Sequence, residues 1–152
     1  MNPLILDEYR SMKPVFQRLN NVVIDVLNEN INASLIEVNA IEARIKKEAS
    51  LKGKLERKGD KYSSIYDITD IVGVRIIAYY NEDVDRIASI AEKIFDVDWS
   101  KSIDKRKTHQ VNSFVYNSLH YICKIPQSRY FDAEHPELNN ISFELQIRTA
   151  LQ

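Results

Sequence analysis

Apolar side chains recur at alternating steps of four and three residues near the start of the chain. The series is Ile5, Tyr9, Met12, Phe16, Leu19, Val23 and Val26. This spacing places them on one stripe of a helix, which packs on a core or on a partner. Pro14 removes one backbone hydrogen bond, so the segment is either kinked there or built from two helices. The polar cluster at 28–32, NENIN, predicts where the helical part ends.

Further helices and the first strand are predicted in the middle of the chain. A second helix is expected from about Ser34 toward Lys47, and helical propensity continues over 49–57 and stops near Gly59. Residues 71–80, IVGVRIIAYY, are rich in β-branched and aromatic side chains, which favours a strand. Residues 82–95 open with acidic side chains and continue with apolar ones at helical spacing, which predicts a helix packed on that strand.

Two more strands are predicted in the last third of the chain. The polar, charged residues 100–112 indicate a mobile loop, and FVYNSLHYICKI at 114–125 is typical of a second strand. The segment that follows is turn-like, and ISFELQI at 141–147 predicts a third strand. We therefore predict an α/β (α+β) fold with one mixed β-sheet and helices on its faces. It forms a single domain over 1–152, in which 1–30 is an N-terminal helical segment.

Composition narrows the class of protein. The chain has 152 residues, of which 21 are basic and 22 acidic, so its net charge is −1. This charge balance does not indicate a general electrostatic affinity for nucleic acid or membranes. Cys123 is the single cysteine, so a disulfide framework is excluded and a reducing compartment fits; we expect bacterial cytoplasm. No run reaches the roughly 20 apolar residues of a membrane helix, and the start lacks signal-peptide features. The chain stops directly after a strand-like segment, so we expect a further C-terminal part.

Two carboxylates stand where strands could bring them together. Glu144 lies on the polar side of the alternating strand ISFELQI, although most such polar faces are merely solvated. Asp70 directly precedes the first strand, where capping a turn is the commoner role. Mg²⁺ is usually held by one or two carboxylates together with substrate phosphates, and this pair could supply them. Without metal, we expect the like charges to raise one of the two pKa values, and Asp70→Asn to leave stability equal or higher.

A basic segment and several missing motifs bear on the ligand. Residues 44–58 concentrate seven cations, which form either a solvated helix face or a phosphate-binding patch: Arg44, Lys46, Lys47, Lys52, Lys54, Arg57 and Lys58. His120 is either a core imidazole or a ligand contact, and the spacing of the three histidines does not favour zinc. No nucleophile elbow surrounds Cys123, and neither a P-loop nor a Rossmann turn is present.

Four ordered segments resemble the synthetase domain of the RelA/SpoT family. They are RIKKEASLKGKLERKG at 44–59, DITDIVGVRII at 67–77, VYNSLHYI at 115–122 and FELQIRT at 143–149. Each motif alone is weak, but the ordered set is specific. The resemblance implies a nucleotidyltransferase-like mixed sheet that binds ATP and GDP or GTP side by side.

The resemblance also implies roles on the ATP side. Arg44 and Arg75 take the places of the arginines on the two faces of adenine, and Asp70 and Glu144 those of the two catalytic, Mg²⁺-binding acids. Glu144 is further implicated in activating the acceptor hydroxyl. The remaining ATP contacts in the matching pattern are Lys46, Ser50, Lys54, Arg57 and Lys58.

On the acceptor side the match is looser. Tyr116 and His120 match the family's guanosine-side Tyr and His, and we place three further residues beside them: Lys105, Gln146 and Arg148. Val115 stands where the motif has Gly, and Asn117 where it has Arg, so the loop must differ in shape because a β-branched residue cannot adopt positive φ cheaply.

The expected activity is that of a GTP pyrophosphokinase of the small alarmone synthetase type. It uses Mg²⁺ to move pyrophosphate from ATP to the 3′-hydroxyl of GDP or GTP. One alternative is the same chemistry on an adenine nucleotide or the 3′ end of tRNA, which would make nucleic acid a partner. Another is a catalytically silent nucleotide-binding regulatory module. A homo-oligomer is compatible with the sequence, and a membrane partner is not expected.

Overall fold

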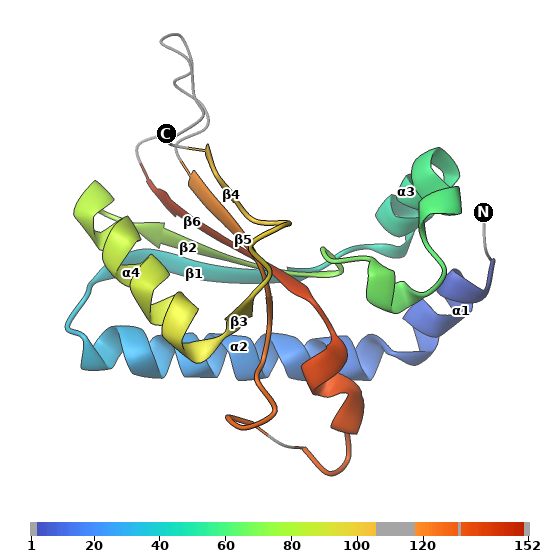
Figure 1. Cartoon of the computed structure of the whole chain (residues 1–152), viewed down its shortest axis with the longest axis horizontal. Coiled ribbons are helices and arrows are strands. Elements are labelled where there is room, and N and C mark those ends of the chain that lie inside the picture. The colour runs from blue at the N-terminus through green and yellow to red at the C-terminus, as the bar shows by residue number, and fades with distance from the viewer. Residues whose placement is uncertain (1–2, 106–117, 131, 151–152) are drawn as a thin grey trace, which may run out of the picture.

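One mixed sheet organises the protein. The computed structural model describes residues 3–105, 118–130 and 132–150. The strands run in the order β1-β2-β6-β5-β3, and β4 also pairs with β5 (Figure 1). β2 and β6 are parallel, whereas the other pairs are antiparallel. The strands are β1 (Val38–Ile45), β2 (Val72–Ala78), β3 (Asp96–Val97), β4 (Ile103–Asp104), β5 (Ser118–Lys124) and β6 (Phe143–Thr149). This architecture confirms the predicted fold class.

The helices follow the predicted pattern at most places. They are α1 (Pro3–Ser11), α2 (Lys13–Ala33), α3 (Glu48–Lys58) and α4 (Asn81–Ile94). The N-terminal stripe is split into two helices, with Pro14 in the first turn of α2, where a missing N–H leaves no bond unmade. Short 3₁₀ helices are η1 (Gly59–Lys61), η2 (Ile65–Asp67) and η3 (Pro136–Asn140). Within the described residues, no helix combines the length and apolar character needed to cross a bilayer.

The sheet has a buried face and a polar face. Alternate residues of β2 and β6 are buried, among them Val74 and Leu145. α2 packs on β1 and β2, and α4 packs on β6 and on α2, so both helices cover the buried face (Figure 1). The edge-on rings of Phe95 and Phe143, with centroids 5.0 Å apart, extend this core. Since side chains alternate along a strand, the residues between the buried ones point to the opposite face.

The helix predicted over 34–47 is wrong. Residues Val38–Ile45 form β1, which pairs with β2 in a register that runs from Val38 opposite Ala78 to Ile45 opposite Val72. The Glu and Ala residues here have good helix propensity, but propensity is a weak prior that strand pairing overrides. Val38, Ile41 and Ile45 also pack against the core from this strand. The chain reverses into β1 through Leu35, whose φ of 58° lies in the left-handed region.

The loop predicted after residue 100 needs a smaller correction, whereas the described part of the strand predicted over 114–125 is confirmed. Ile103–Asp104 form β4 instead of loop, because Ile103 pairs with His120 and Asp104 with Leu119. β5 begins at Ser118. Residues 106–117, which include the rest of the predicted loop and the first part of the predicted strand, lie outside the described residues.

Candidate active site

A cavity of about 260 Å³ opens on the polar face of the sheet, across β1, β2 and β6. It is slightly smaller than the roughly 300 Å³ at which small-molecule pockets usually begin, so it suits part of a nucleotide. Its lining includes several residues singled out from the sequence, on three strands and the turn before β2. The lining residues are Glu42, Ala43, Arg44, Asp70, Gly73, Val74, Arg75, Glu144 and Gln146.

Arg44 and Arg75 reach this cavity from neighbouring strands. Arg44 on β1 is opposite Gly73 on β2, and its Cγ and Nε lie 3.8 Å from where a Cβ at position 73 would be. Arg75 lies two residues further along β2, on the same face. Its Nε donates a hydrogen bond of 3.2 Å to Gln146 Oε1, and its Nη1 is 3.7 Å from Glu42 Oε2. The guanidinium of Arg75 is therefore held from both sides.

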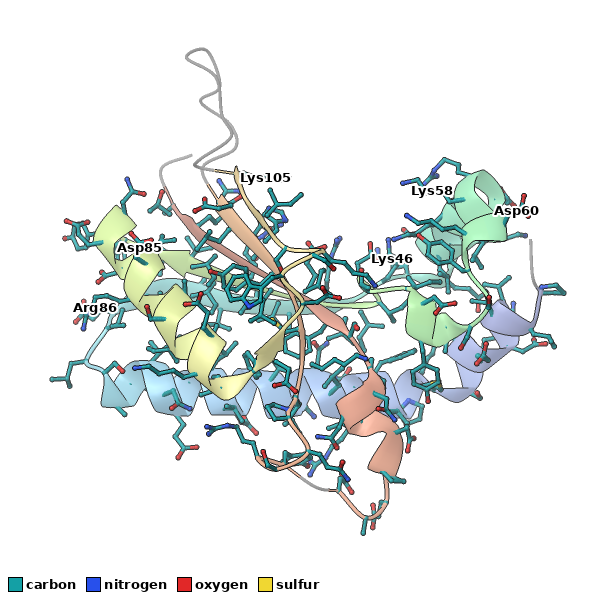
Figure 2. The ribbon with its side chains drawn as sticks, in the orientation of Figure 1. Lys46, Lys58, Asp60, Asp85, Arg86 and Lys105 are labelled. Atoms are coloured by element: carbon teal, nitrogen blue, oxygen red, sulfur yellow. The ribbon has the colours of Figure 1, made fainter. Side chains whose placement is uncertain are left out.

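Asp70 ties the sheet to α3. Its carboxylate is 3.0 Å from Lys46 Nζ and 2.7 Å from Lys54 Nζ. The Lys46 backbone is itself fixed, because its N–H donates to Ile71 O at 2.7 Å and its carbonyl accepts from the Tyr9 hydroxyl at 2.6 Å. Figure 2 shows Lys46 at the end of the sheet that faces α3. One carboxylate thus joins the end of β1 to the middle of a helix.

The two lysines decide the protonation of Asp70. Burial is the largest single influence and raises its pKa, but the hydrogen bonds and charges of Lys54 and Lys46 together outweigh burial, so the pKa lies below its ordinary value. Asp70 is therefore an anion at neutral pH. The expectation that one carboxylate of the metal pair would have a raised pKa is wrong for this residue, because it assumed that no cation stands beside the pair.

Glu144 is the second acid of the cavity. The imidazole of His120, with Nδ1 3.7 Å from Glu144 Oε1, is the largest influence and lowers the pKa of Glu144. Burial and the charge of Asp70 act in the opposite direction, and Arg44 assists the lowering. The net shift is downward, so repulsion between the acids does not prevail at either carboxylate. Glu144 is ionised at neutral pH and can accept a proton.

Three further residues predicted to contact ATP lie neither in the cavity lining nor beside Asp70. Ser50, Arg57 and Lys58 are exposed on α3, where Figure 2 labels Lys58. Arg57 lies over Gly53, with Nη1 3.3 Å from where a Cβ would be. Their contact with phosphates stays a prediction, whereas Lys46 and Lys54 stand beside Asp70.

The predicted acceptor residues lie further along the same face. His120 is opposite Gln146 in the register of β5 and β6, and its Nε2 is 3.0 Å from Ser118 Oγ. Arg148 is opposite Ser118, near the end of β6 away from Asp70, and Lys105 directly follows β4. Gln146 contacts Arg75 and therefore lies next to an ATP-side residue.

Tyr116, the ring predicted to stack on the acceptor, lies outside the described residues, as do Val115 and Asn117. The acceptor side is therefore described only through β5, β6 and the residue after β4.

Sequence reasoning missed Glu42 and Gly73, which both line the cavity. Glu42 and Arg44 are two residues apart and share one face of β1, a spacing that is uninformative once the segment is taken for a helix. Gly73 carried a usable signal, because an isolated glycine in a strand often marks a bulge or a site where a ligand comes close. A Cβ there would meet Arg44 at an ordinary contact distance of 3.8 Å, so Arg44 alone does not require glycine.

The residues present fit a magnesium ion. Asp70 and Glu144 offer hard oxygen ligands in one cavity, and Mg²⁺ is typically held by such a pair plus substrate phosphates. Each carboxylate has about four lone-pair positions, so Asp70 can bind a cation besides its lysines. Among the described residues, no group of three or more His, Cys, Asp or Glu side chains is placed to hold a metal on its own. Substrate oxygens would have to complete the shell.

Comparisons with known proteins agree with this arrangement. The family described as "Region found in RelA / SpoT proteins" matches residues 43–152. The small alarmone synthetase 1 of Bacillus subtilis has a TM-score of 0.69 and 21% identity, over 95% of this chain and 72% of that one. Small alarmone synthetase 2 of Bacillus subtilis gives 0.68 and 24%, over 90% and 70%. A GTP pyrophosphokinase family protein from Streptococcus pneumoniae gives 0.68 and 20%, over 95% and 70%. No curated protein sequence matches the chain.

Proposed function

The chain belongs to the RelA/SpoT family, and from this premise we propose that it is an alarmone synthetase. It transfers the pyrophosphoryl group of ATP to the 3′-hydroxyl of GDP or GTP, which makes (p)ppGpp. The observation that carries the proposal is that one cavity collects Arg44 and Arg75 together with Asp70 and Glu144. In addition, the structurally similar small alarmone synthetase 1 of Bacillus subtilis has been crystallised with pppGpp and with AMPCPP.

The donor nucleotide binds through the two arginines and the two lysines. Planar guanidinium groups stack on a purine, which is worth about 1–3 kcal/mol per base. Gly73 leaves the floor of the cavity open beneath the Arg44 side chain. The ATP phosphates then point toward Lys46 and Lys54, which face the same carboxylate of Asp70 from two elements. In the absence of ATP, Asp70 keeps these ammonium groups in place.

Asp70 and Glu144 are the residues that would hold Mg²⁺. When bound, the ion supplies charge neutralisation on the transferring phosphates. Asp70 lies just before β2, and Glu144 lies on β6, the parallel strand that pairs directly with β2. The two acids are therefore held at the same end of the sheet.

The chemical step needs a base at the acceptor hydroxyl. The 3′-oxygen forms a bond to the β-phosphorus of ATP, the bond from that phosphorus to the bridging oxygen of the α-phosphate breaks, and AMP leaves with the electron pair. Glu144 accepts the proton of the hydroxyl, because its carboxylate is ionised and lies in the cavity. His120, 3.7 Å away, is a positioning residue for Glu144.

Two alternatives compete with this function. A silent nucleotide-binding module has no need for two ionised acids in one cavity, so the presence of both Asp70 and Glu144 favours an enzyme. An adenine nucleotide or the 3′ end of tRNA would use the same donor side. No feature of the described residues favours either of these acceptors over GDP or GTP.

Purified protein with labelled ATP and Mg²⁺ tests the proposal, in separate reactions with GDP, GTP, AMP-series nucleotides and tRNA. Labelled product is expected with GDP and GTP, and none from Asp70→Asn or Glu144→Gln. Product with tRNA or an adenine nucleotide alone would change the acceptor. Near-normal turnover by either variant would overturn the assignment of the two acids.

A further inference from the structure

Glu42 is a third acid that lines the cavity, and neither metal binding nor proton transfer uses it. It lies on β1 two residues before Arg44, and it is opposite Arg75 in the register. Its Oε2 is 3.7 Å from Arg75 Nη1, while Gln146 holds the other side of the same guanidinium. Glu42 is exposed and lines the cavity. Its exposed carboxylate can accept hydrogen bonds from a ligand in the cavity.

Stacking alone does not choose between purines. A guanidinium plane stacks on any base, because every base has a π face. Choice between adenine and a 6-oxo purine therefore needs a group at the edge of the base. Adenine presents a 6-amino donor there, whereas guanine and hypoxanthine present an oxygen acceptor. An ionised carboxylate only accepts hydrogen bonds, so it attracts the first edge and repels the second.

The other side chains of the cavity that could accept a hydrogen bond already have partners. Asp70 contacts Lys46 and Lys54, Gln146 accepts from Arg75, and Glu144 lies beside His120 near the reacting end. Glu42 is thus the acid of the cavity that lies next to Arg75 and apart from the two lysines and His120.

We infer that Glu42 selects adenine in the donor nucleotide by accepting a hydrogen bond from the 6-amino group through Oε1. This inference rests on the proposed ATP site. It makes Glu42 a specificity residue, which acts on the base itself in addition to its contact with Arg75.

Binding of ATP and of ITP, measured by titration calorimetry without acceptor, tests the inference. ITP differs at the base edge, where an oxygen replaces the amino group. Wild-type protein should prefer ATP by about 10-fold, the order expected for one hydrogen bond to a charged group. Glu42→Gln places an amide donor at the same position and should bring the two affinities to within about threefold. Glu37→Gln, an exposed carboxylate just before β1 and outside the cavity, removes the same charge and should keep the wild-type preference.

Three results would decide against a role at the base edge. They are equal affinity of the wild type for both nucleotides, an unchanged preference in Glu42→Gln, or equal weakening of both nucleotides by this variant, which would reduce Glu42 to a support of Arg75. All three leave the ATP site itself intact. Failure of wild-type protein to bind either nucleotide would instead contradict the proposed function.

Discussion

Replacing Asp70 with asparagine should destabilise the folded protein, contrary to what two neighbouring acids alone would predict. Asp70 faces two lysines that are only 16% and 17% exposed, and its own side chain is 23% exposed. Asparagine keeps the shape but leaves Lys46 and Lys54 close together without an anion. The relief of repulsion from Glu144 is smaller than this loss, because the lysines already outweigh every influence that raises the pKa of Asp70.

The loss of folding free energy in Asp70→Asn lies between two limits. Exposed ion pairs contribute about 0–1 kcal/mol, whereas breaking a fully buried pair costs about 3–5 kcal/mol. For partly buried groups we expect about 1–3 kcal/mol. In a domain of this size each kcal/mol shifts Tm by about 2–4 °C, so Tm should fall by roughly 2–12 °C.

Thermal unfolding followed by circular dichroism, in metal-free buffer at low salt, measures this change. Glu144→Gln is the matched control, because Glu144 is more exposed and its neighbour His120 lies 3.7 Å away; its Tm should change by less. A double-mutant cycle with Lys54→Met should show coupling beyond the roughly 0.5 kcal/mol of independent sites. An unchanged or raised Tm for Asp70→Asn, or an additive cycle, would refute the reasoning.

Three further predictions follow from the site. The pKa of Asp70 is lowered in the folded protein, so the stabilisation that this carboxylate contributes is complete above the ordinary pKa of about 3.9 and is lost as pH falls through the folded-state pKa. The Tm of the wild type should therefore drop more than that of Asp70→Asn between about pH 5 and pH 3, and equal slopes of Tm against pH would contradict this. Arg44→Ala should weaken ATP binding by about 10-fold or more in calorimetry without changing acceptor binding, and equal losses for both ligands would rule out separate subsites. Tyr116→Ala should lower kcat/KM for the acceptor by roughly 10- to 100-fold while Tyr116→Phe costs little, and loss of activity in the Phe variant together with unfolding of the Ala variant would make the ring structural.

Strong local patterns predicted most of the fold. The β-branched run of β2, the alternation in β6 and the amphipathic spacing of α4 each combine propensity with periodicity, and all three appear in the structure. β1 could not be predicted in this way. It is an edge strand with several partly exposed positions and helix-forming Glu and Ala, so its conformation depends on pairing with β2. That pairing links residues far apart in the sequence.

The candidate site likewise has residues that local sequence patterns predicted and contacts that they could not predict. Arg44, Asp70, Arg75 and Glu144 were predicted from ordered motifs, and the structure gathers them in one cavity. The contacts of Asp70 with two lysines could not be predicted, because they depend on how α3 approaches the turn before β2. The position of Glu42 could not be predicted, because its segment was predicted to be a helix. Its neighbour across the sheet is known only once β1 is paired with β2.

The most direct test of the central claim is the fate of ATP labelled on its γ-phosphate, in a reaction with GDP and Mg²⁺. Pyrophosphoryl transfer predicts that AMP and a labelled guanosine tetraphosphate appear in equal amounts, and that both are absent with Glu144→Gln. Formation of ADP with labelled GTP would show transfer of a single phosphoryl group, and release of label without a nucleotide product would show hydrolysis. Either result would contradict the account.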